Sequence, residues 1–218
     1  MEIIIAIILA FLAFGNQPTV TKPPIDTLQL DKLPQNRLPD GGFVIGNPKA
    51  PVTIIEFGDY ACPHCQEYLP TMNQFIETYV KTGKAKFEFR ILPTAGGALT
   101  QFIGTVLVCM EKQKSGTYWK AYDILFKDAI AGNYDSNTLR NMAGDLGVNY
   151  ADALNCAQSE KQVDTDGALA ATLNVHGTPA IRVRDAKGKA HSLVLNDQAY
   201  DQGGPSFDVL SQYMAQFK

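Results

Sequence analysis

Residues 51–92 carry the feature that most constrains the fold, because strand and helix patterns alternate along them. Residues 51–57 are apolar and β-branched and are followed by Gly58, which predicts a buried strand. Residues 63–81 place apolar side chains at helical spacing, and residues 86–92 alternate between apolar and polar. A strand, a helix and a strand within about forty residues predict two parallel strands joined by a crossover helix.

The rest of the chain extends this unit into an α/β fold. Residues 98–174 show only helical patterns, with Ser136 expected as an N-cap and Gly147 as a C-terminal stop. Strand patterns return at 180–183 and 191–195, and the turn residues 187–189 between them predict an antiparallel pair. A last helix is expected from Pro205 onward. The predicted order is β-α-β, a helical block, then β-β-α.

The N-terminal residues predict a targeting segment followed by a linker. Residues 3–14 are twelve consecutive apolar residues, which is short for a membrane-spanning helix of about 17–25 residues. They fit the apolar part of a signal peptide cleaved after Gly15, although the usual basic leader is missing. We expect residues 1–15 to be a signal peptide or a short membrane anchor, with a buried helix as the alternative. Residues 16–42 contain five prolines and are expected to be a linker.

These patterns divide the body into three parts and exclude some functions. Residues 43–96 and 175–218 are expected to form one domain, with residues 97–174 as a helical insertion. Lys and Arg number 19 and Asp and Glu 22, giving a net charge of −3. This balance argues against a nucleic-acid-binding protein, which would usually carry a basic face. Four cysteines are too few for a disulfide-dense scaffold.

The chemistry is expected at Cys62-Pro63-His64-Cys65, which follows the first buried strand and opens a helix. A helix N-terminus favours the thiolate of Cys62, His64 can add positive charge, and Cys65 one turn later suits a resolving thiol. A zinc site would need about four ligands, and a second pair at ligand spacing is missing. A purely structural bridge across so small a loop would stabilise little. The motif therefore predicts redox catalysis without a metal or an organic cofactor.

Two further features belong with this motif. Glu56 lies in an otherwise apolar strand, so its carboxyl group is expected to be a buried acid or base that exchanges protons with Cys65. The alternative is a side chain on the exposed face. Gly177-Thr178-Pro179 precedes the third strand, and its proline is a candidate for a cis peptide bond. Its backbone could pair with an extended substrate, and an ordinary turn is the alternative.

Together these residues resemble the DsbA-like branch of the thioredoxin superfamily, over about residues 43–217. The lead-in at residues 46–52 looks like that branch as well. The resemblance implies a thioredoxin fold with an inserted all-helical subdomain, and a periplasmic dithiol oxidase that acts on reduced substrate proteins. It implies a nucleophile, a resolving thiol, a proton relay, a thiolate-stabilising residue and a cis-proline, which are respectively Cys62, Cys65, Glu56, His64 and Pro179. Reoxidation would then need a DsbB-like membrane partner linked to quinone.

One departure from the best-known oxidases concerns the direction of the reaction. Thr178 precedes the proline where those oxidases have valine, and threonine is also seen there in related isomerases. A disulfide isomerase or reductase is therefore the alternative within the same fold. The oxidase is favoured because the dimerisation domain typical of the isomerases is missing. A hypothesis from another class is a non-catalytic chaperone that binds peptides in the groove around Gly177–Pro179.

The two remaining cysteines predict a structural disulfide. Cys109 shares an apolar helical face with Leu99, Phe102 and Val106, and Cys156 lies in a short helix of the same block. Two neighbouring thiols in an oxidising compartment tend to pair. We expect a bridge that is separate from Cys62, and two independent buried thiols are the alternative.

Overall fold

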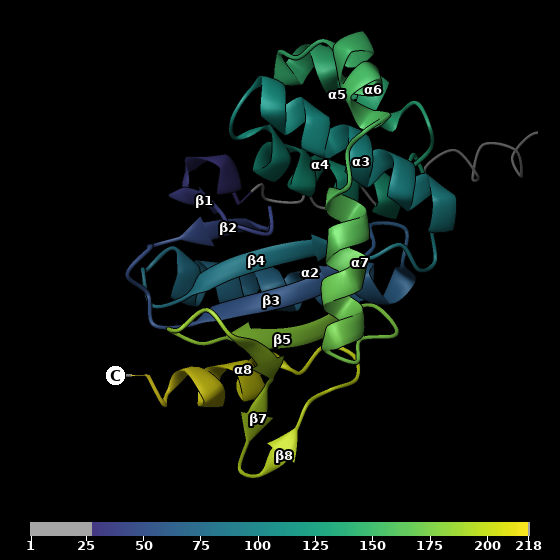
Figure 1. Ribbon diagram of the computed structural model, residues 1–218. Coiled ribbons are helices and arrows are strands. Elements are labelled where there is room, and N and C mark those ends of the chain that lie inside the picture. Colours follow the sequence, from purple (N-terminus) through teal and green to yellow (C-terminus); the bar gives the residue numbers. More distant parts are fainter. Residues whose placement is uncertain (1–27, 218) are drawn as a thin grey trace, which may run out of the picture.

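The computed structural model describes residues 28–217 of the chain (Figure 1). The signal peptide or anchor predicted for residues 1–15 and the first part of the predicted linker lie outside these residues. Within residues 28–217, every helix is too short or too polar to cross a membrane.

A mixed sheet of six strands forms the centre, in the order β1-β2-β4-β3-β5-β6. Its strands are β1 (Gln35–Arg37), β2 (Phe43–Gly46), β3 (Thr53–Gly58), β4 (Lys86–Ile91), β5 (Ala180–Arg184) and β6 (Ala190–Ser192). The predicted parallel pair is confirmed, because β3 runs parallel to β4 and the two are joined by α2 (Pro63–Phe75) and the π-helical turn η2 (Ile76–Val80). The predicted antiparallel pair of β5 and β6 is also confirmed.

The folded body begins earlier than the predicted linker allows. Leu28 and Leu30, which starts the short 3₁₀ helix η1 (Leu30–Lys32), are buried, and β1 pairs with β2. The prolines did not prevent this strand because Pro34 and Pro39 flank it instead of interrupting it, and β1 lies at the edge of the sheet. The expectation of a linker up to residue 42 was therefore wrong for its last part.

Helices cover both faces of the sheet and one of its sides. They are α3 (Gly97–Gln113), α4 (Thr117–Ile130), α5 (Thr138–Leu146), α6 (Tyr150–Ala157), α7 (Gln162–Thr172) and α8 (Phe207–Met214). Figure 1 shows α7 in front of the sheet, α2 and α8 behind it, and α3 to α6 above it. A small hairpin of β7 (Val194–Leu195) and β8 (Gln198–Ala199) follows β6.

Two predicted helix starts were displaced by one or two residues. The N-cap of α5 is Asn137 instead of Ser136. Helix α8 begins at Phe207 instead of Pro205, because the Ser206 hydroxyl accepts a hydrogen bond from the Val209 N–H and so caps the first turn.

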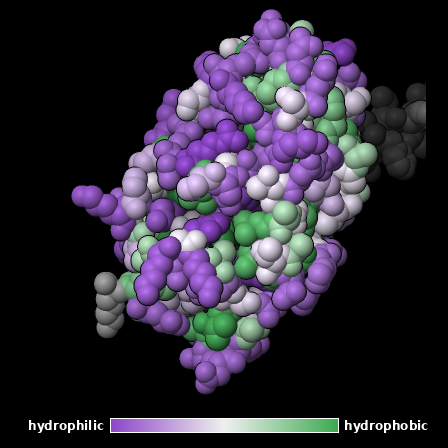
Figure 2. Space-filling view, viewed as in Figure 1, coloured by the Kyte–Doolittle hydropathy of each residue, from purple (hydrophilic) through white to green (hydrophobic). Residues whose placement is uncertain are grey.

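The hydrophobic core has two parts, one on each face of the sheet. The larger part joins the sheet, α2 and the helical block through Phe87, Phe89, Trp119, Tyr122 and Phe126, which contact one another in pairs. The smaller part lies between β3 and α7. In Figure 2 the surface over α5 and α6 is mainly hydrophilic, whereas hydrophobic residues gather beside α7. Strand β3 alternates between the two parts, so Ile54 and Glu56 point toward α2.

Charged residues are buried on the α7 face of β4. The guanidinium of Arg90 is fully buried and lies 2.7 Å from Glu88, 2.9 Å from Asp166 on α7 and 2.9 Å from Asp40. Arg184 on β5 also contacts Glu88, at 2.7 Å. Burial of ionic groups is costly unless they have partners, and here they pair with one another. The network therefore ties α7 and the loop before β2 to the middle of the sheet.

Candidate active site

Cys62 lies where β3 has ended and α2 begins. It is the N-cap residue of α2, and Pro63 occupies the first helical position, where the missing N–H costs nothing. The Cys62 backbone N–H donates to the Asp59 carbonyl at 3.0 Å. The side chain is a free thiol that is 6% exposed, and its Sγ donates to the Thr178 carbonyl at 3.3 Å. Cys62 is thus held at the helix N-terminus, directly against the loop before β5.

Cys65 lies one turn further along α2 and is sealed from solvent. Its thiol is free and 0% exposed. Burial raises the pKa of the Cys65 thiol, and the nearby carboxyl group of Glu56 raises it further. The two cysteines of the motif therefore differ in burial: Cys62 keeps a small exposed fraction and Cys65 keeps none.

Glu56 is buried on the same side of the sheet. It is 1% exposed, and its Oε2 has no hydrogen-bond partner among the described residues. Burial raises the pKa of Glu56 from 4.5 to about 8. The structure thus excludes the alternative of a side chain on the exposed face. A carboxyl group with this pKa can release and take up a proton near neutral pH, next to the buried Cys65.

The loop before β5 brings the remaining predicted residues to the motif. The Thr178–Pro179 peptide bond is cis. A groove of about 280 Å³ runs beside it and is lined by His64, His176, Gly177, Thr178, Pro179, Ala180, Asp201, Gln202 and Gly203. Residues more than a hundred positions apart in the sequence therefore meet in one groove at the start of α2.

His64 lies at this groove but is turned toward solvent. Its side chain is 79% exposed, and its Nδ1 lies 3.3 Å from Oε2 of Glu67, one turn along α2. The sequence suggested a contact with the Cys62 sulfur, whereas the contact seen in the described part of the chain is with Glu67. An exposed pair of this kind contributes little to stability.

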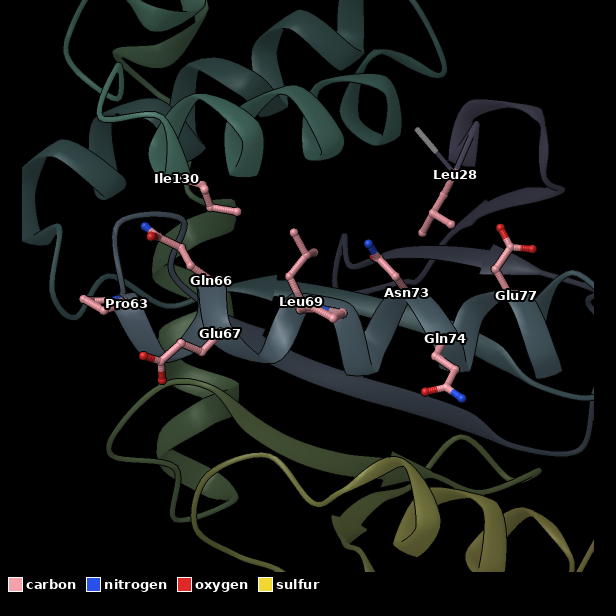
Figure 3. Close-up of a pocket in the computed structure, with 10 residues that line it drawn as sticks. Leu28, Pro63, Gln66, Glu67, Leu69, Asn73, Gln74, Glu77 and Ile130 are labelled. Atoms are coloured by element: carbon pink, nitrogen blue, oxygen red, sulfur yellow. The ribbon is translucent and has the colours of Figure 1, made fainter. Parts of the chain in front are cut away.

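A second, larger groove follows the opposite side of α2. It measures about 820 Å³ and is lined by Leu28, Pro63, Gln66, Glu67, Leu69, Pro70, Asn73, Gln74, Glu77 and Ile130. Figure 3 shows Ile130 and Leu28 facing α2 across it, with Pro63 at one end and Glu77 at the other. This groove was not predicted, because it is formed jointly by α2, the end of α4 and the segment before η1.

Cys109 and Cys156 form a disulfide between α3 and α6. Their Cα atoms are 5.8 Å apart, within the usual range for a bridge. The carboxyl group of Glu160 lies within 4.8 Å of both sulfur atoms and forms an ion pair with Lys112. The bridge belongs to the helical block and the Cys62–Cys65 motif to the strand–helix junction.

Two residues of the site were missed by the sequence analysis. The side chain of Asp59 is fully buried just after β3, and its carboxylate accepts hydrogen bonds from the backbone N–H groups of Ala61, Thr94 and Gly96. The hydroxyl of Thr94 lies 2.6 Å from that of Thr178. A signal for Asp59 was present, since a carboxylate directly after a buried strand needs partners. Thr94 has no such signal, because it lies in a loop far from both motifs in the sequence.

Comparison with known proteins identifies the class to which this fold and site belong. A family model described as Thioredoxin matches residues 39–194, which is most of the chain. The chain therefore belongs to the thioredoxin family. This agrees with the predicted fold class, a thioredoxin fold carrying an inserted helical subdomain.

Within that family the chain is DsbA-like. It is 26% identical over 175 residues to disulfide bond formation protein D of Bacillus subtilis, covering 74% of this chain and 73% of that protein. Among solved structures, alpha-DsbA1 of Wolbachia pipientis matches with a TM-score of 0.65 and 22% identity, over 88% of this chain and 96% of that one. Oxidised BdbD of Bacillus subtilis matches with a TM-score of 0.60 and 21% identity, over 79% and 90%. The protein is a thiol–disulfide oxidoreductase of the DsbA-like type.

Proposed function

We propose that the protein forms disulfide bonds in reduced substrate proteins by donating a Cys62–Cys65 disulfide. The observation that carries the proposal is the asymmetry of the two thiols. Cys62 keeps a small exposed fraction of 6% and lies against the Thr178 carbonyl, whereas Cys65 is fully buried. Such a pair can be attacked at one sulfur only, which gives the exchange a defined order.

The exchange proceeds in two displacements. A substrate thiolate attacks Sγ of Cys62, the Cys62–Cys65 bond breaks, and Cys65 leaves with the electron pair. A second thiolate of the substrate then attacks the substrate sulfur of this mixed disulfide and releases Cys62 as the thiolate. The substrate has lost two electrons and gained a disulfide, and the protein holds two reduced cysteines.

Glu56 supports the first displacement by supplying a proton. Burial raises the pKa of Cys65, so Cys65 is a poor leaving group unless it is protonated as the bond breaks. Glu56 has a pKa of about 8 and is therefore mostly protonated at neutral pH. Its role in this proposal is to protonate Cys65 on reduction and to take the proton back on reoxidation.

The loop at Gly177–Pro179 is the proposed place where the substrate backbone binds. The Thr178 carbonyl accepts the Cys62 thiol proton at 3.3 Å. Once Cys62 is part of a disulfide it carries no proton, so this carbonyl becomes free to accept an N–H of an extended substrate segment. His64 lines the same groove and is proposed to stabilise the Cys62 thiolate that the second step releases.

Reoxidation and location complete the proposal. By resemblance to the DsbA-like branch, we propose a DsbB-like membrane partner that passes the electrons to quinone. The Cys109–Cys156 bridge and the apolar N-terminal run support a periplasmic or otherwise extracytoplasmic site of action. If the N-terminal segment is retained, it would tether the protein to the membrane.

The test compares oxidation of a reduced model protein with reshuffling of a scrambled one. With an oxidase, the reduced substrate regains its activity quickly and the scrambled substrate slowly. With an isomerase, the scrambled substrate recovers faster than the reduced one. Cys65→Ser should accumulate mixed disulfides through Cys62, since no internal thiol can resolve them. Cys62→Ser is the matched control and should accumulate none. If Cys62→Ser retained full activity, the protein would be a non-catalytic chaperone instead.

A further inference from the structure

The carboxylate of Asp59 contacts three segments beside the candidate active site, namely the turn before α2, the loop between β4 and α3, and α3 itself. Its Oδ1 accepts the Ala61 N–H at 2.9 Å and the Thr100 hydroxyl at 2.5 Å. Its Oδ2 accepts the N–H groups of Thr94 at 2.8 Å and Gly96 at 2.9 Å. Both oxygens thus face donors. The carboxylate joins the turn before α2 to the loop between β4 and α3.

The contacts of Asp59 determine which residue donates in the hydrogen bond between the hydroxyls of Thr94 and Thr178. The Thr94 hydroxyl lies 3.3 Å from Oδ2 of Asp59, and this oxygen can only accept there. A hydroxyl has one proton, so Thr94 gives its proton to Asp59. At the 2.6 Å contact between the hydroxyls of Thr94 and Thr178, Thr94 must then accept and Thr178 must donate. The hydroxyl proton of Thr178 therefore points toward the Thr94 oxygen.

The same residue, Thr178, also lies against the cysteines. A hydrogen bond from the Thr178 side chain lowers the pKa of Cys65, against the larger opposing effect of burial. The Thr178 carbonyl meanwhile holds the Cys62 thiol. Thr178 therefore contacts the Cys62 sulfur through its carbonyl, and its single hydroxyl proton has two competing acceptors: the Thr94 oxygen and a sulfur of the pair.

We propose that Thr94 is a positioning residue that draws the Thr178 hydroxyl proton away from the active-site sulfur atoms, and that Asp59 enforces this by taking the proton of Thr94. Without Thr94 the Thr178 hydroxyl turns to a sulfur and stabilises the reduced, thiolate-bearing state. The native arrangement therefore makes the Cys62–Cys65 pair less oxidising than its own loop would allow. This inference rests on the proposed function, because it concerns the redox balance of the same pair.

The test is the equilibrium of the full protein with glutathione. In this reaction one Cys62–Cys65 disulfide and two glutathione thiols give two protein thiols and one glutathione disulfide. Thr94→Val should raise the equilibrium constant for reduction by about threefold to tenfold, as expected for one hydrogen bond. Thr94→Ser keeps the hydroxyl and should match the wild type. Thr94 is exposed, so neither change opens the core, and Thr94→Ala provides a second removal of the hydroxyl.

Two further variants separate the proposed relay from a general disturbance. Thr100→Val also removes a hydroxyl from Asp59 but does not touch Thr178, so its equilibrium constant should stay within about twofold of the wild type. In a Thr178→Val background, Thr94→Val should have no further effect, because the contested proton is gone. An unchanged constant in both Thr94→Val and Thr94→Ala, or an equal shift with and without Thr178, would overturn the inference. Failure of the wild type to oxidise a reduced substrate would contradict the proposed function and leave this equilibrium interpretable.

Discussion

Two pairs of cysteines in this molecule have opposite proposed roles, one in thiol–disulfide exchange and the other in structural support. Cys62 and Cys65 lie in one turn at the start of α2 and are free thiols. Cys109 and Cys156 are 47 residues apart in the sequence and are bridged between α3 and α6. The first pair is split between a reachable and a sealed sulfur, whereas the second holds two helices together.

A glutamate lies near each pair, and the two glutamates differ in their partners. Glu56 has an unpartnered oxygen, and burial raises its pKa to about 8. Burial acts in the same direction on Glu160, but the hydrogen bonds from Lys112 and from the backbone of Gln162 and Lys161 outweigh it and lower the pKa of Glu160. Near the reactive pair a proton can therefore move, while near the structural bridge the carboxylate is held charged. The surroundings of the two cysteine pairs therefore fit the proposed exchange at one pair and structural support at the other.

Substitutions in the two cysteine pairs should affect the exchange rate very differently, and this is the largest expected effect. Cys62→Ala should reduce thiol–disulfide exchange to the uncatalysed rate, because the only reachable sulfur of its pair is lost. The double variant Cys109→Ala/Cys156→Ala should keep the exchange rate within about twofold of the wild type, as expected for distant and independent sites. Reduction of a disulfide-bonded model protein by a dithiol measures both. A large loss in the double variant would show that the two pairs are coupled.

Glu56 predicts a pH-dependent difference in stability. Because the pKa of Glu56 is raised from 4.5 to about 8, the folded state keeps a proton that the unfolded state releases between these pH values. The free energy of unfolding of the wild type should thus fall as the pH rises through this window. Glu56→Gln lacks this loss and should be more stable at pH above 8, by on the order of 4 kcal/mol.

Urea unfolding at a series of pH values checks this difference. The gap between Glu56→Gln and the wild type should open above about pH 4.5 and level off above about pH 8. Glu67→Gln, an exposed residue of α2, is the matched control and should produce no such widening. Parallel curves for Glu56→Gln and the wild type would mean that Glu56 has another partner in solution.

Removal of the Cys109–Cys156 disulfide should change the stability of the protein without changing its exchange chemistry. Its removal in Cys109→Ala/Cys156→Ala should lower the free energy of unfolding by about 2–4 kcal/mol, since the bridge closes a loop of 47 residues. Chemical unfolding of the oxidised proteins measures this. An equally stable double variant would place the stabilisation of the helical block in its packing alone.

Substitution of His64 should have the smallest effect on the redox equilibrium of the Cys62–Cys65 pair. His64→Ala should lower the glutathione equilibrium constant for reduction by about twofold to fivefold, because an exposed histidine paired with Glu67 stabilises the Cys62 thiolate only weakly. His191→Ala, an exposed histidine on β6, is the control and should change nothing. A shift larger than tenfold would show that His64 turns to the sulfur in solution.

Local patterns of the sequence predicted most of the fold and the burial of residues at the candidate site. The apolar run before Cys62 and the helical spacing after it predicted β3 and α2, and the apolar setting of Glu56 predicted its burial. Such predictions succeed because each depends on residues close in the sequence. Strand β1 was missed because prolines flank it, and proline is informative only when its position in the strand is known.

What the sequence could not show are contacts between distant segments. The alternation of β4 predicted one apolar face, but the opposite face is also buried, because Arg90 is paired with Asp166 of α7. The contact between Thr94 and Thr178 joins two loops 84 residues apart. The preference of His64 for Glu67 over sulfur also depends on side-chain directions that spacing alone does not determine.

The short strands at the two edges of the sheet affect how the protein meets other chains. Strands β1 and β6 each have three residues, and proline lies on either side of β1. Long, flat edges invite other strands to add to them and start aggregation. The proposed substrates are incompletely folded and therefore rich in unpaired strands, so they pose this hazard directly. Short edges limit such pairing and leave an incoming segment the loop at Gly177–Pro179, the proposed place of substrate binding beside Cys62.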